Sequence, residues 1–231
     1  TRPYSEMSYF IARRSEQYIE LMHTQNISPN WNVHAHYRLI SAPGIYRNQK
    51  TSHNNYLITN WFTSKDKRYA NFITIVANKI KGGENGGIDT ALNYIDNPDY
   101  AERIGIPVKL GGGQNFNSGL FNTDVPTGNK YDDFNAVMRQ QFDFGRKDSI
   151  VNDSSVVPLF FPRVRLEHTI RYSAHKYLYS DENPTDENAR AFYLAAYGLE
   201  NLNNPFRRED LWKELVNDFS IYTFPDEKNT Q

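Results

Sequence analysis

The feature that most constrains this chain is an alternation of polar and apolar residues at period two, repeated over short segments with very short breaks between them. Along 31–42, one set of alternate positions holds Asn32, His34, His36 and Arg38, and the other holds Val33, Ala35, Tyr37 and Leu39. Period two places successive side chains on opposite faces of a strand. Repeated over strands long enough to cross a bilayer, this pattern predicts a barrel with lipid outside and a hydrated, charged lumen.

The alternation is strongest between Pro162 and Tyr179, where three arginines and a glutamate share one face. An ordinary sheet with a salt-bridged solvent face also explains one such strand. Repetition over 134–143 favours the hydrated lumen. Val137 falls on the polar side and Gln140 and His168 fall on the apolar side, as they would near a membrane interface. The predicted lumen-lining residues are His34, His36, Arg38, Arg139, Arg163, Arg165, Glu167 and Arg171.

The composition permits a membrane protein that crosses with strands. The 231 residues have a mean hydropathy of -0.72 and contain no apolar run of the roughly 18 residues that a membrane-crossing helix needs. A spanning strand needs only about 9–11 residues, with every second one apolar. Aromatic residues make up 14% of the chain, with 16 Tyr, which is typical of interfacial girdles but equally of a Tyr-rich soluble β-protein.

Charge and cysteine content exclude several classes of protein. The net charge is -1 without a basic stripe, so no nucleic-acid partner is expected. The chain has no Cys, which excludes a disulfide scaffold and a cysteine metal site. It opens at Thr1-Arg2-Pro3 without a secretion signal, and we expect a processed or partial chain.

Eight candidate strands follow from the alternation: 4–13, 16–27, 31–42, 53–63, 68–80, 131–145, 159–179 and 211–224. Breaks at 28–30, 64–67 and 146–158 fall on one side of such a sheet. Breaks at 43–52, 81–130 and 181–210 fall on the other, together with the short break near Arg14-Ser15. Long loops of outer-membrane barrels lie outside the cell, so we expect 81–130 and 181–210 to be extracellular. Two segments stay open between helix and strand, namely 186–199 and 211–224.

Several short motifs in order along the chain resemble the putative porin family of Bacteroidetes outer membranes. They are Glu16-Gln17, His23-Thr24-Gln25-Asn26, Trp31-Asn32, Lys67-Arg68-Tyr69, Asn78-Lys79-Ile80, Glu84-Asn85-Gly86-Gly87-Ile88, Leu166-Glu167-His168-Thr169, Tyr177-Leu178-Tyr179, Asp210 and Leu215-Val216-Asn217. The resemblance touches most of 1–224, with 90–130 and 181–209 diverging. It implies an outer-membrane β-barrel longer than this chain, and it implies location and architecture more firmly than transport.

No candidate active site or cofactor site emerges from the sequence. His34 and His36 have the spacing of two zinc ligands on one strand face, but no third ligand is identifiable, so lumen lining is the better interpretation. The glycines at 82–87 and 111–113 lack the ending of a phosphate-binding loop, and Asp96, Asn97 and Asp99 lack ordered calcium-ligand spacing. His23 and His168 have no triad partner at an interpretable spacing. We therefore expect neither catalysis nor a cofactor.

The sequence as a whole predicts one all-β domain over 1–231, an antiparallel transmembrane barrel in the bacterial outer membrane to which other strands are added. The first functional hypothesis is passive diffusion of small solutes through an Arg-lined lumen, with a preference for anions. The second is a non-conducting accessory barrel in a larger assembly, in which the 81–130 loop contacts a partner or plugs the lumen. Its partners would be membrane lipid and other outer-membrane or periplasmic proteins. A third is a soluble periplasmic β-sandwich that binds glycans.

Overall fold

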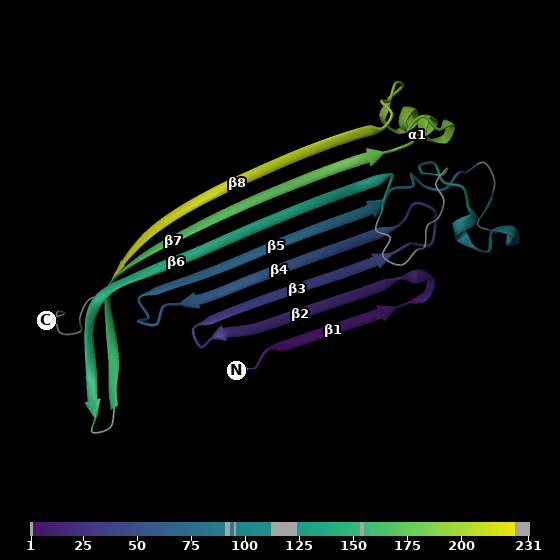
Figure 1. Ribbon diagram of the computed structural model, residues 1–231. Coiled ribbons are helices and arrows are strands. Elements are labelled where there is room, and N and C mark those ends of the chain that lie inside the picture. The colour runs from purple at the N-terminus through teal and green to yellow at the C-terminus, as the bar shows by residue number, and fades with distance from the viewer. Residues whose placement is uncertain (1, 91–92, 95, 112–123, 153–154, 225–231) are drawn as a thin grey trace.

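Eight strands form a single antiparallel sheet in which every strand pairs with its neighbours in sequence (Figure 1). The structure is a computed structural model that describes residues 2–90, 93–94, 96–111, 124–152 and 155–224. The strands are β1 (Tyr4–Ile11), β2 (Gln17–Ser28), β3 (Trp31–Ala42), β4 (Thr51–Thr63), β5 (Tyr69–Gly83), β6 (Gly128–Asn152), β7 (Ser155–Asp181) and β8 (Phe206–Thr223). The all-β antiparallel class predicted from the alternation is confirmed.

Tight turns fix the register at one end of the sheet, which we call the turn end. β2 and β3 are joined by Pro29 and Asn30, and β4 and β5 by 64–68. In the second turn, the Ser64 hydroxyl donates to Asp66 Oδ1 at 2.6 Å and accepts the Tyr69 N–H at 2.9 Å. The Ser64 hydrogen bond, helped by the backbone N–H of Arg68, lowers the pKa of Asp66 below its ordinary value. The turn residues therefore close this hairpin with their own side chains.

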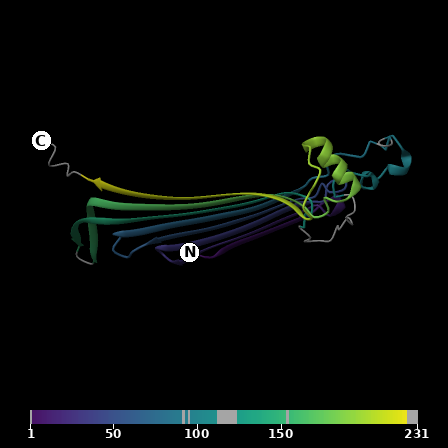
Figure 2. The same ribbon diagram turned by 90° about the horizontal axis from the view of Figure 1, so that it is seen from above.

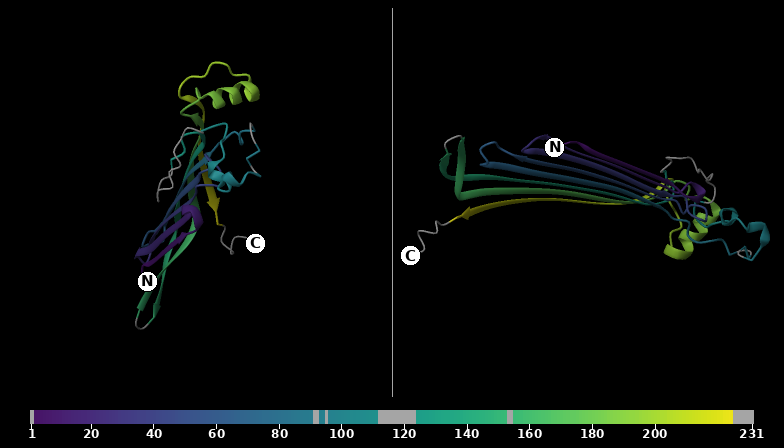
Figure 3. Two further views of the ribbon diagram at one scale, coloured as in Figure 1. Left: turned by 90° about the vertical axis from the view of Figure 1, so that its right-hand side faces the viewer. Right: turned by 90° about the horizontal axis from the view of Figure 1, so that it is seen from below.

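The remaining connections, among them the longest ones, lie at the opposite end, which we call the loop end (Figures 2 and 3). They comprise 12–16, 43–50, 84–127 and 182–205. Apart from the break at 146–158, the predicted distribution of breaks between the two ends is confirmed, including the short break near Arg14. Within 84–127 the structure describes two short 3-10 helices, Pro98–Tyr100 and Arg103–Gly105, and a bridge between Ile88 and Val108. This connection therefore folds on itself, with Ile106 and Val108 almost fully buried.

The prediction of a break over 146–158 is wrong, because β6 and β7 continue together beyond the other strands and bend away from the sheet (Figure 1). A bulge between Phe144 and Gly145 starts the bend. A Cβ atom on Gly145 would lie 2.0 Å from the Phe161 carbonyl oxygen, so only glycine fits there. Gly145 pairs with Pro162 across the two strands. Glycine and proline are typical of loops, which is why the sequence predicts a break here, but at a bulge both residues are compatible with a strand.

Of the two segments for which the sequence allows helix or strand, 186–199 is mainly helix and 211–224 is mainly strand. Residues 187–197 form the only α-helix of the described residues, α1 (Glu187–Tyr197), which ends at Gly198 in the left-handed conformation with φ of 66°. Residues 211–223 belong to β8, which is paired with β7 along its whole length. None of the helices in the described ranges has the length and hydropathy of a membrane-crossing helix.

The sheet is open, with β1 and β8 as its two edges. Closure into a barrel, expected from the sequence, is therefore not formed by these eight strands. Element contacts run mainly between sequence neighbours, and no second sheet layer covers either face over the described residues (Figure 2). A cluster of buried side chains lies at the loop end, where Leu110, Ala189 and Tyr193 pack together.

Candidate functional site: the polar face of the sheet

The register of the strand pairs places most of the predicted site residues on one face of the sheet, which we call the polar face. His34, His36 and Arg38 lie on this face of β3. The pairings continue across the sheet from Arg38 through Asn55, Asn78 and Asp133 to His175. By the same pairings the polar face includes Arg139 on β6 and Arg165, Glu167 and Arg171 on β7. Arg163 lies at the bulge, where the alternation of faces is interrupted, and the pairings do not assign it to this face.

Arg139, Arg165 and Arg171 are each matched with a carboxylate on a neighbouring strand. Arg165 makes a bidentate pair with Asp143, with Nε and Nη2 at 2.7 and 2.9 Å from the two carboxylate oxygens. The Arg139 Nη2 atom donates to Glu167 Oε2 at 2.6 Å, and Arg171 pairs with Asp218 of β8 at 3.0 Å. The positive charge of these three arginines is therefore largely neutralised by the paired carboxylates, and the polar face carries ion pairs rather than unpaired cations at these positions.

A hydrogen-bonded network centred on Asp133 crosses four strands of the polar face. Asp133 accepts from Asn78 Nδ2 at 2.9 Å and from Asn135 Nδ2 at 2.8 Å, and His175 Nδ1 lies 2.8 Å from its Oδ1 atom. Asn55 extends the network to β4 by donating to Asn78 at 2.7 Å. On the N-terminal side, His36 Nε2 lies 2.8 Å from Glu20 Oε1. Such connected polar groups hold one another's orientation.

Sequence reasoning missed the carboxylates that organise this face: Glu20, Asp133, Asp143 and Asp218. Asp143 was recognised as part of an alternating strand but not as a partner of Arg165. The alternation indicates the face of each residue, but cross-strand partners depend on the register between strands. The numbers of charged residues gave a signal, since Arg165 and Arg171 of β7 each have an acidic partner on a neighbouring strand.

The two histidines at zinc-like spacing do not gather further ligands. The rings of His34 and His36 lie 6.3 Å apart between centroids. Across the residues that the structure describes, no three His, Cys, Asp or Glu side chains come together as a metal site. Hydrogen bonding with Glu20 accounts for His36 instead.

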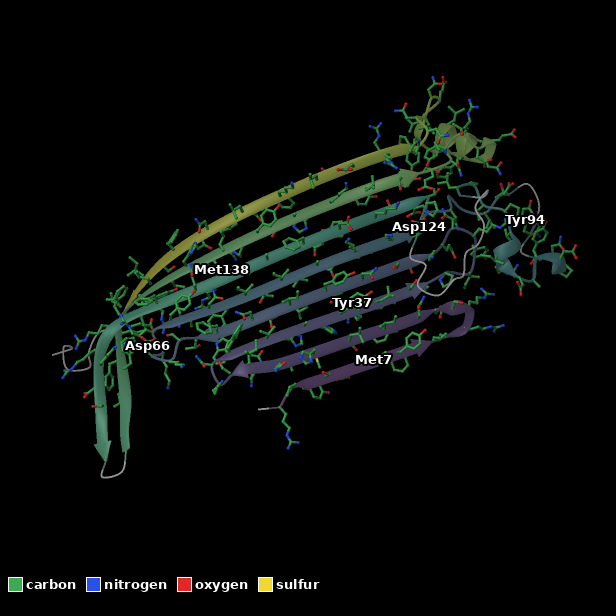
Figure 4. All side chains as sticks on the ribbon, viewed as in Figure 1. Met7, Tyr37, Asp66, Tyr94, Asp124 and Met138 are labelled. Carbon is green, nitrogen blue, oxygen red and sulfur yellow. The ribbon has the colours of Figure 1, made fainter. Side chains whose placement is uncertain are left out.

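The opposite face of the sheet, which we call the apolar face, carries aliphatic and aromatic side chains over its middle. Met7, Tyr37 and Met138, labelled in Figure 4, lie on this face. The same rows contain exposed residues that a soluble sheet would bury: Leu21, Ile58, Phe134, Tyr172, Leu215 and Phe219. Lysines replace them towards the loop end, at Lys79, Lys81, Lys130, Lys176 and Lys213.

Polar groups on the apolar face bond to one another. Near the turn end, Tyr69 donates to Gln140 at 3.1 Å, Gln140 Nε2 lies 3.0 Å from His168 Nδ1, and His168 Nε2 lies 2.6 Å from Asn217 Oδ1. His168 also stacks on Phe219 with ring centroids 4.2 Å apart. The faces predicted for Gln140 and His168 are therefore correct, and their polar atoms are satisfied within the face.

The family described as "Putative porin" matches residues 1–228. The chain belongs to this family. A search of curated proteins and a search of solved structures gave no match. Membership in the porin family confirms the resemblance drawn from the hairpin motifs, and its match extends through 90–130 and 181–209, where the motifs diverge. It indicates a transport or structural role rather than catalysis, and it agrees with a two-faced antiparallel sheet.

Proposed function

We propose that this chain forms part of an outer-membrane β-barrel in which the polar face lines a water-filled lumen and small solutes diffuse passively. The observation that carries the proposal is the division of one sheet into two chemically different faces. The apolar face exposes aliphatic and aromatic side chains over its middle rows, whereas the polar face carries the ion pairs and the Asp133 network. Lipid stabilises the first kind of surface and water the second.

The height of the apolar band supports a membrane crossing. On β6 it runs from Phe134 to Phe142, which spans about 27 Å along the strand at about 3.4 Å per residue. With the usual strand tilt this approaches the apolar height of about 25 Å in outer-membrane barrels. Lysines beyond one end of the band place their charged ends where phospholipid headgroups would lie.

Strand edges supply a further argument for a larger barrel. Unpaired backbone groups cost several kcal/mol each in hydrocarbon, so β1 and β8 require partner strands in a membrane. The bulky charged side chains of the polar face need more room than the filled interior of an eight-stranded barrel offers. We therefore place these strands in a wider barrel.

Single cysteines test the assignment of the faces, since the natural chain has none. Ile58 and Thr59 are neighbours on β4 but belong to the apolar and polar faces, respectively. In liposomes, a membrane-impermeant maleimide should label Thr59→Cys and leave Ile58→Cys unlabelled, and a lipid-borne quencher should act on a fluorophore at Ile58→Cys only. Equal labelling of both positions contradicts the assignment.

Conduction is tested with the full-length protein in a planar lipid bilayer. Stepwise currents that scale with salt concentration are the result expected of an open aqueous pore. A correctly inserted but silent protein would overturn diffusion as the function.

The accessory role is a second candidate, favoured by the folded cover at the loop end. Leu110, from the connection between β5 and β6, packs with Ala189 and Tyr193 of α1 at the loop end. If this cover blocks the lumen, the barrel is silent and should co-purify from detergent with a partner protein at fixed stoichiometry.

A further inference from the structure

A cavity of about 490 Å³ opens at the loop end of the polar face. The sheet contributes Asn129, Tyr177, Tyr179 and Arg208, which are direct or next neighbours in the strand register on that face. The opposite wall is formed by Phe192, Tyr193 and Tyr197 of α1. Volumes of this size are typical of small-molecule sites. The cavity therefore lies where a solute would first meet the polar face from the loop end.

The aromatic wall is held in place by a buried hydrogen-bond network. The Tyr193 hydroxyl donates to Asp181 Oδ2 at 2.8 Å and lies 2.6 Å from the Tyr179 hydroxyl. Asp181 is fully buried and also accepts from the Thr127 hydroxyl at 3.0 Å and from the Asn183 N–H at 3.0 Å. α1 is thus fixed on the strand ends by polar bonds, and the shape of the cavity is preformed.

Two further tyrosines, Tyr177 and Tyr197, line the cavity at the margin of this packing. Tyr197 is 66% exposed and Tyr177 is 44% exposed, whereas Tyr193 is 2% exposed. The cluster that anchors α1 comprises Leu110, Ala189 and Tyr193 with their partly buried neighbours, and neither exposed tyrosine belongs to it. Tyr197 meets the rings of Phe192 and Tyr193 at centroid distances of 6.0 and 6.4 Å, and the large exposed fractions of Tyr197 and Tyr177 leave ring surface available to a ligand.

Fixed polar groups stand at the edge of these rings. Asn129 donates to Glu84 Oε1 at 2.6 Å and accepts a hydrogen bond from the Tyr177 hydroxyl. On the other side, the Arg208 guanidinium carbon lies 5.6 Å from the centre of the Phe206 ring. The edge thus offers a carboxylate acceptor, an amide and a guanidinium donor around an aromatic surface.

We propose that this cavity binds a sugar unit of a neutral oligosaccharide. A pyranose ring has apolar C–H faces that stack on aromatic rings, and hydroxyls around its edge that bond to carboxylate, amide and guanidinium groups. A purely apolar ligand would leave Glu84 and Arg208 without new partners, and an anion would meet the Glu84 carboxylate. The role of the site, capture of a solute before it enters the lumen, rests on the proposed diffusion function.

Calorimetry on the full-length protein in detergent tests the site with maltohexaose, cellohexaose, xylohexaose and mannohexaose as probes. At least one is expected to bind, and Tyr197→Ala should weaken that binding by about tenfold. Leu194→Ala is the matched control, because Leu194 is 51% exposed on the same helix but does not line the cavity. No binding by any of the four, or binding that Tyr197→Ala leaves unchanged, overturns the proposal.

A planar bilayer separates this proposal from the diffusion function. If the pore conducts, the bound oligosaccharide should interrupt the current when added on the loop-end side, and Tyr197→Ala should shorten the interruptions. Binding by calorimetry with a silent bilayer would remove the diffusion function and keep the site. Steady currents without binding would keep the diffusion function and remove the site.

Discussion

At the scale of residues, the two arginine pairs of β7 differ in burial and should differ in what their loss costs. Arg165→Ala leaves Asp143, which is 4% exposed, without its bidentate partner, so the free energy of unfolding should fall by about 2–3 kcal/mol. Arg171→Ala breaks a pair that is half exposed on both sides and should cost less than about 1 kcal/mol. Urea unfolding in detergent micelles measures both, and equal losses would contradict the difference in burial.

Tyr193 makes the docking of α1 sensitive to alkaline pH. Burial, helped by the hydrogen bonds with Tyr179 and Asp181, raises the pKa of Tyr193 well above its ordinary value. A raised pKa means that the docked state requires the protonated phenol, so its stability is fully present below about pH 10 and falls as pH rises further. A nitroxide on Leu194→Cys should therefore become mobile above about pH 10.

The matching variant is Tyr193→Phe, which removes the titrating hydroxyl and two hydrogen bonds from the buried network. We expect the nitroxide to be more mobile at neutral pH, with a docking loss of about 1–3 kcal/mol, and the alkaline transition to shrink. An unchanged transition in this variant would assign the pH dependence to another group.

Residue positions on a face were predictable, but residue partners were not. The alternation around His36 and Arg165 is local, so it predicts which side each side chain occupies. The pairs His36 with Glu20 and Arg165 with Asp143 join residues 16 and 22 positions apart, and a change of register on one strand would separate them. The contacts of the candidate site therefore could not be predicted from the sequence without the register that the structure shows.

At the scale of elements, the kinked extension of β6 and β7 depends on the bulge at Gly145. Gly145→Ala brings a methyl group to 2.0 Å from the Phe161 carbonyl oxygen, so the hairpin must shift and the yield of folded protein should fall several-fold. Gly82→Ala on β5 is the control, because a Cβ there meets nothing within 4 Å. Electrophoretic heat modifiability measures folding, and similar yields for both variants would count against a strict requirement at the bulge.

Elements with one dominant period were predicted well, and those with mixed signals were not. β3 alternates cleanly and its observed bounds equal the predicted 31–42. β8 has apolar residues at Leu211, Leu215 and Phe219, spaced four apart, which fits both period two and the helical period. Hydrogen-bonded pairing with β7 makes this segment a strand. This pairing is a tertiary interaction, which the local sequence pattern does not predict.

At the scale of the whole molecule, the charge of the polar face sets what a lumen lined by it would prefer. Between the bulge and the loop end, the eight described strands place more carboxylates than arginines on this face, even when Asp181 under α1 is left aside. The arginines that the register places there are Arg38, Arg139, Arg165, Arg171 and Arg208; the carboxylates are Glu6, Glu20, Asp133, Asp143, Glu167, Asp210, Glu214 and Asp218. The anion preference expected from the arginines alone is therefore not what this face favours.

We expect a weak preference for cations, because the excess of carboxylates stands beside arginines already neutralised in pairs. In a tenfold KCl gradient the reversal potential should have the sign of a potassium-selective pore. Asp218→Asn should move it towards anions and Arg171→Ala further towards cations, since each removes one half of the same exposed pair. The shifts should shrink as salt is raised, because screening shortens the reach of both charges. A chloride-selective pore that neither variant alters would mean that charges outside this face govern permeation.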